Sequence, residues 1–66
     1  MKAKFLKTGN IQVTGIWNEA MLEDLDIMAE KSGCTMNATD MGGVDYLISG
    51  TKEQIQNFVK LWNSKD

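Results

Sequence analysis

The chain has 66 residues, a net charge of -2 and 42% hydrophobic residues, which is typical of one small globular domain spanning residues 1–66. It contains no histidine, no arginine and no proline. Without imidazole the usual general base for a serine, threonine or cysteine nucleophile is missing. Without guanidinium the chain lacks the forked donor that grips phosphate or guanine in a bidentate manner. We therefore expect neither an enzyme nor a direct nucleic-acid binder.

The cysteine content indicates a reducing environment. Cys34 is the single cysteine, so an internal disulfide is excluded, and no apolar run is long enough for a signal sequence or a membrane span. A cytoplasmic protein without a membrane anchor is the simplest expectation. Asp40 and Asp45 flank a Gly-Gly pair, but two carboxylates alone do not make a metal site, and we expect no metal and no cofactor.

Residues 2–16 predict a β-hairpin. Short β-branched segments flank the "TGN" at positions 8–10, which is typical of a tight loop that contains glycine. A three-residue loop places four apolar side chains on one face of the hairpin, namely Ala3, Phe5, Ile11 and Val13. We expect that face to point toward the core and Gly15 to end or bulge the second strand.

Residues 19–32 predict the first helix. Asn18 is a suitable N-cap, Gly33 is placed as the C-cap residue, and apolar residues between them recur at helical spacing. A second hairpin follows, with strands at residues 34–39 and 44–49 around a turn at residues 40–43. The apolar stripe of Ile55, Phe58, Val59 and Trp62 predicts a second helix over residues 52–63.

These elements follow the order ββαββα, which indicates an α+β fold. If each helix crosses the same face of one sheet, the second strand lies beside the fourth, which gives a four-stranded antiparallel sheet in the order 1-2-4-3 with both helices on one side. This topology resembles a circularly permuted ferredoxin-like fold. The likeness concerns topology alone and implies no function.

The segment "SGTKEQ" at positions 49–54 places Gly-Thr-Lys between a predicted strand and a predicted helix, as a phosphate cradle does, although the order is not the Gly-Lys-Ser/Thr of such a cradle. A Walker-type loop needs Gly-x-x-x-x-Gly-Lys-Ser/Thr, and that long loop is missing here. Thr51 and Gln54 fit a capping box at the start of the second helix. A second hypothesis is an anion or ligand site at this helix N-terminus, formed by Gly50, Thr51 and Lys52.

An acidic stripe follows the first helix. Its members recur at intervals of 4, 3 and 4 positions and are Glu19, Glu23, Asp26 and Glu30. A solvated helix face explains such a stripe, because charge runs usually serve solvation. The functional hypothesis is that the stripe binds a basic protein partner or a nucleic-acid-binding protein by imitating phosphate.

The sheet face turned away from the helices is expected to be polar, with Leu6 and Leu47 as apolar exceptions. A core of this size is marginal, and uncovered edge strands can pair with other chains. We therefore expect a homo-oligomer whose self-interface includes Leu6 and Leu47.

Two functional hypotheses follow. The first is a small, non-enzymatic, acidic interaction protein, an inhibitor or adaptor that binds a protein partner through the stripe. Small domains of this type are frequent among bacteriophage accessory and anti-defence proteins, so a viral protein is one expectation. The alternative is a homo-oligomeric protein that binds a small ligand or nucleotide at positions 50–52.

Overall fold

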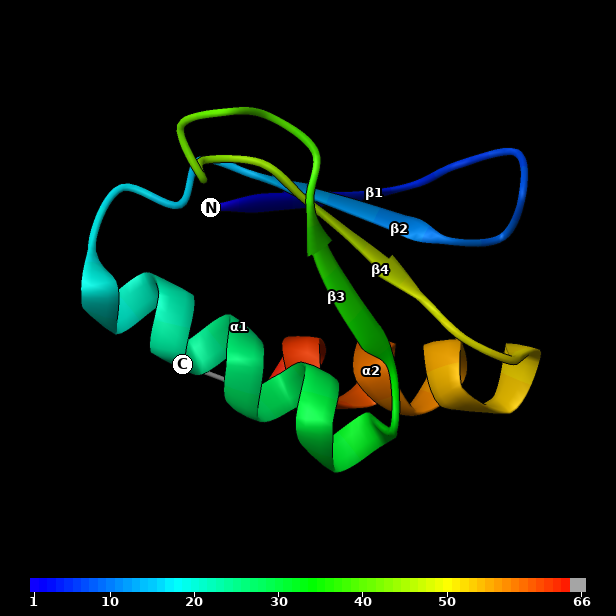
Figure 1. The fold of residues 1–66 in the computed structure, drawn as a ribbon. Coiled ribbons are helices and arrows are strands. Elements are labelled where there is room, and N and C mark those ends of the chain that lie inside the picture. The colour runs from blue at the N-terminus through cyan, green and yellow to red at the C-terminus, as the bar shows by residue number, and fades with distance from the viewer. Residues whose placement is uncertain (65–66) are drawn as a thin grey trace.

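The computed structural model describes residues 1–64 and shows four strands and two helices in that range. The elements are β1 (Lys2–Phe5), β2 (Ile11–Thr14), α1 (Glu19–Ser32), β3 (Thr35–Ala38), β4 (Tyr46–Ser49) and α2 (Lys52–Ser64). The strands form one antiparallel sheet in the order β1-β2-β4-β3, and both helices lie against the same face (Figure 1). The predicted α+β fold and its strand order are confirmed.

The first hairpin has the predicted register. Phe5 stands opposite Ile11, and the Leu6 N–H donates to the Asn10 carbonyl over 2.8 Å, so that residues 7–9 form a three-residue loop. Gly9 accommodates the turn with a φ of 91°. The sheet face of every residue in β1 and β2 follows from this register.

The second hairpin has a longer connection than predicted. The Asp40 carboxylate accepts hydrogen bonds from the backbone N–H groups of Val44 and Asp45, each over 3.0 Å. Because these two donors serve the turn, β4 begins at Tyr46 and not at Val44. Of the two adjacent glycines, Gly43 takes the left-handed conformation, with a φ of 70°.

The caps of α1 are those that the sequence predicts. The Asn18 Oδ1 accepts a hydrogen bond from the Met21 N–H over 2.9 Å. At the other end, Gly33 has a φ of 79°, and the Cys34 N–H donates to the Ala29 carbonyl over 2.9 Å. Because Cys34 belongs to this cap, β3 starts one residue later than expected.

The core lies between the middle strands and the two helices. Its nine buried apolar residues are Ile11, Val13, Ile16, Leu25, Met28, Ala29, Ile48, Ile55 and Phe58. Ser32 is also buried, and its hydroxyl donates to the Met28 carbonyl over 2.8 Å, which satisfies the polar group inside the helix layer. The rings of Phe58 and Trp62 stack at 6.2 Å between centroids and extend the core along α2.

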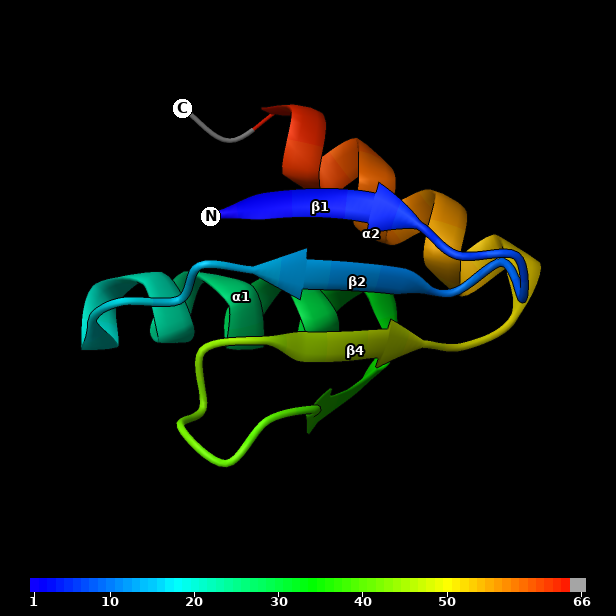
Figure 2. The ribbon, with the colours of Figure 1, turned by 90° about the horizontal axis from the view of Figure 1, so that it is seen from above.

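Strand β1 lies outside this core. Ala3 and Phe5 do lie on the helix side of the sheet, as predicted, because they pair with Val13 and Ile11. Their expected burial is wrong, however, because every residue of β1 is exposed and Phe5 retains 65% of its accessible surface. In the view from above, α1 runs beneath the middle strands, whereas α2 extends past the β1 edge of the sheet (Figure 2). α2 therefore passes beneath β1, but a hollow of about 210 Å³ separates the two elements, and the side chains of β1 stay exposed.

Neither α1 nor α2 is long and apolar enough to cross a lipid bilayer, and no further helix is present in residues 1–64.

Candidate partner-binding surfaces

The acidic stripe is one exposed row along α1. All four of its members, Glu19, Glu23, Asp26 and Glu30, are exposed. Within residues 1–64 none of them forms an ion pair or a side-chain hydrogen bond. Their negative charges are therefore not compensated by neighbours within the described fold and are open to a charged partner.

Part of this stripe borders a shallow apolar hollow between α1 and the sheet. The hollow measures about 500 Å³, and we call it the acidic shelf; its lining residues are Glu19, Leu22, Glu23, Asp26, Met36 and Tyr46. Leu22, Met36 and Tyr46 are half-buried, which makes a floor of apolar atoms beside three carboxylates. Glu30 lies outside the shelf, one helical turn beyond Asp26.

The apolar floor of the shelf was not identified from the sequence. The register of the second hairpin places Met36 and Tyr46 on the helix side of the sheet, which is the side of the core. In the fold β3 is an edge strand, so α1 covers Met36 incompletely, and Tyr46 lies beside it at the first position of the neighbouring strand β4. The sequence feature that indicates such an apolar floor is an apolar side chain that faces the helices from an edge strand.

The start of α2 is a capping box, as predicted. The Thr51 N–H donates to the Gln54 Oε1 over 2.8 Å, and the Gln54 N–H donates to the Thr51 Oγ1 over 3.2 Å. The Gln54 side chain also lies over Gly50, where its Oε1 would be 2.7 Å from an added Cβ. Gly50 and Lys52 line a hollow of about 470 Å³ beside the β1–β2 loop, whereas Thr51 does not.

The two leucines proposed for a self-interface do not form one patch. Leu47 pairs with Gln12 on one side and Asn37 on the other, so polar residues flank it within its row of the sheet. Leu6 follows the end of β1, with β2 lying between it and β4. Both leucines are half-buried, and the open sheet face presents them as separate apolar islands.

The loop between β3 and β4 holds a carboxylate with a defined structural task. Backbone hydrogen bonds from Asp45 and Val44 favour the ionised form and lower the pKa of Asp40 below its ordinary value of 3.8.

Within the described residues no group of three or more histidine, cysteine, aspartate or glutamate side chains is placed to hold a metal ion. Cys34 is a half-buried free thiol.

Comparisons of this chain with protein-family models, with curated proteins and with solved structures gave no significant match.

Proposed function

We propose that this chain is a small, non-enzymatic interaction protein that acts by occupying a surface of a protein partner, as an inhibitor or an adaptor. The observation that carries the proposal is the acidic shelf, which combines three exposed carboxylates with an apolar floor of three half-buried side chains. Charges at the rim of an interface steer association and select partners, whereas apolar contacts at its centre supply affinity. The shelf offers both in one surface.

The chemistry of the shelf defines the partner. Glu19, Glu23 and Asp26 favour a surface rich in lysine or arginine, such as that of a nucleic-acid-binding protein. Leu22 and Met36 favour an apolar side chain that projects from that basic surface. The composition fits this class of function, because a chain without histidine or arginine lacks the commonest catalytic and phosphate-binding groups. The single free cysteine suits a reducing, cytoplasmic setting.

Charge reversal with a matched control tests the proposal. We expect affinity capture with the wild-type protein to recover a partner that is lost with the double variant Glu23→Lys and Asp26→Lys. Asp24→Lys is the control, because Asp24 is an exposed carboxylate of the same helix that does not line the shelf. A partner held equally well by the double variant and by the control would contradict the proposal.

The alternative is a homo-oligomeric protein that binds a small ligand or nucleotide at the start of α2. The hollow beside Gly50 and Lys52 favours it. The capping box opposes it, because the Gln54 side chain already accepts from the Thr51 N–H that an anion would use. A thermal-shift screen separates the two functions, because a ligand at 100 times its dissociation constant adds about 2.7 kcal/mol to the free energy of unfolding.

A further inference from the structure

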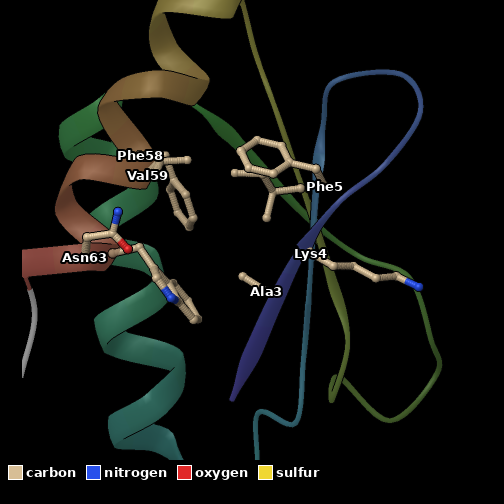
Figure 3. Close-up of a pocket in the computed structure, with 8 residues that line it drawn as sticks. Ala3, Lys4, Phe5, Phe58, Val59 and Asn63 are labelled. Atoms are coloured by element: carbon tan, nitrogen blue, oxygen red, sulfur yellow. The ribbon is translucent and has the colours of Figure 1, made fainter.

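A groove runs along the free edge of the sheet, between β1 and α2. One part of it measures about 210 Å³ and is lined mainly by apolar side chains, among them Ala3, Phe5, Val59 and Trp62. In the close-up, Ala3 and Phe5 point from β1 toward α2, while Lys4 points to the opposite face of the sheet (Figure 3). Two further hollows share Phe5 with this one and continue along α2. We call the three together the edge groove.

The backbone of β1 is available to another strand. In an antiparallel ladder, alternate residues of an edge strand direct their N–H and C=O groups away from the neighbouring strand. The Leu6 N–H donates to Asn10, so the residues at odd positions in β1, Ala3 and Phe5, direct theirs outward. The side chains of the same two residues line the edge groove. An added strand would thus hydrogen-bond to β1 and cover the groove at once.

The edge groove and the acidic shelf carry charges of opposite sign. The edge groove and the adjoining hollow on the open sheet face are bordered by four lysines, Lys2, Lys4, Lys52 and Lys60. No carboxylate lines these hollows among residues 1–64, although the chain carries 9 acidic residues against 7 basic ones. The acidic shelf, in contrast, contains three carboxylates and no lysine. The occupant of the edge groove should therefore be acidic.

We propose that β1 and the edge groove form a second docking surface, which binds an extended acidic segment of a protein partner as a fifth strand of the sheet. Side chains of a strand alternate between two faces. One set of the segment's side chains would be apolar and would contact Phe5, Val59 and Trp62 in the groove. The other set would be aspartate or glutamate and would lie beside Lys2 and Lys4 on the open face. This site is separate from the acidic shelf and binds a segment of the opposite charge.

A second copy of the chain meets these requirements less well. Pairing of β1 with β1 in register about Ala3 places Lys2 opposite Lys4 of the other copy, and like charges in such positions are destabilising. The other edge strand, β3, presents Thr35 and Asn37 on the open face, where Lys2 and Lys4 favour carboxylates. Backbone pairing would be retained in that arrangement, but charge complementarity would not.

The probe is a short synthetic peptide in which glutamate alternates with valine. It is titrated into the 66-residue chain, and binding is followed by NMR. We expect saturable binding with a dissociation constant below about 1 mM, with the largest shifts at the Ala3 and Phe5 amides. Lys4→Glu should weaken binding about tenfold, whereas Lys31→Glu, the same change on α1, should not. A peptide methylated on alternate backbone nitrogens should not bind, because it cannot complete the ladder.

Three results would overturn the proposal. The first is the absence of saturable binding up to about 1 mM peptide. The second is a set of NMR shifts centred on α1, which would indicate adventitious contact elsewhere. The third is equal affinity for wild type and Lys4→Glu in samples whose circular dichroism shows both to be folded. Each result leaves the test of the acidic shelf unaffected, because none of the groove residues lines the shelf.

Discussion

Phe5 and Phe58 provide a direct test of whether β1 lies outside the core. Both side chains lie on the helix side of the sheet, yet Phe58 is 0% exposed and Phe5 is 65% exposed. Replacing Phe58 with alanine removes a fully buried ring and should lower the free energy of unfolding by about 3–5 kcal/mol. Full burial of such a side chain contributes about 1.5–3 kcal/mol, so Phe5, which buries about a third of its surface, should lose only about 0.5–1 kcal/mol on the same replacement.

The total free energy of unfolding of so short a chain is itself small. At about 0.05–0.15 kcal/mol per residue, a chain of 66 residues has a free energy of unfolding of about 3–10 kcal/mol. Phe58→Ala should therefore remove a large share of the stability and, at the lower end of this range, unfold the protein, whereas Phe5→Ala should remain folded throughout the range. Urea denaturation followed by circular dichroism measures both midpoints, with equal m-values as the check for unchanged compactness. If Phe5→Ala were as destabilising as Phe58→Ala, β1 would pack on α2 in solution and the edge groove would be closed.

Three further predictions concern local structure. Gly33→Ala should cost about 1 kcal/mol in urea denaturation, because the C-cap requires a φ of 79°; an unchanged midpoint would contradict that conformation. Thr51→Ala should also cost about 1 kcal/mol by removing the N-cap of α2, and Thr51→Ser, which keeps the hydroxyl, should not. Asp40 has a lowered folded-state pKa, so its stabilising effect is present above about pH 4 and is lost as the pH falls through the folded-state value. Thermal melts should therefore show a stability gap between wild type and Asp40→Asn that narrows in acid; a gap independent of pH would refute the role of the charge.

Much of the fold follows from local signals in the sequence. The alternation of Ile11 and Val13, the N-cap Asn18 and the C-cap Gly33 each have one favourable structural interpretation, and together they determine element order and strand register. The alternation of side chains along β1 also predicts correctly that Phe5 faces the helix side of the sheet. The alternation cannot predict whether a helix covers that residue, because cover depends on how closely α2 approaches β1, which is set by packing among distant residues.

The candidate surfaces were harder to predict for the same reason. The stripe on α1 is a property of one helix and could be identified from spacing alone. The shelf beside it requires Met36 and Tyr46 from two other elements, and it exists because β3 is an edge strand. The second hairpin shows a related effect on a smaller scale, in which a single carboxylate, Asp40, diverts two backbone donors from the predicted strand.

The central pair of strands has a consequence for how the chain folds. β2 and β4 come from different ββα halves, and Ile11 pairs with Ile48 across most of the chain length. Such pairing requires the closure of a long loop before its contacts form, which slows folding and favours a single cooperative transition. A fragment that ends after α1 would leave Val13 and Leu25 without the strand and helix that cover them. Neither half of the chain should therefore fold alone, whereas the two halves expressed as separate fragments should regain structure on mixing.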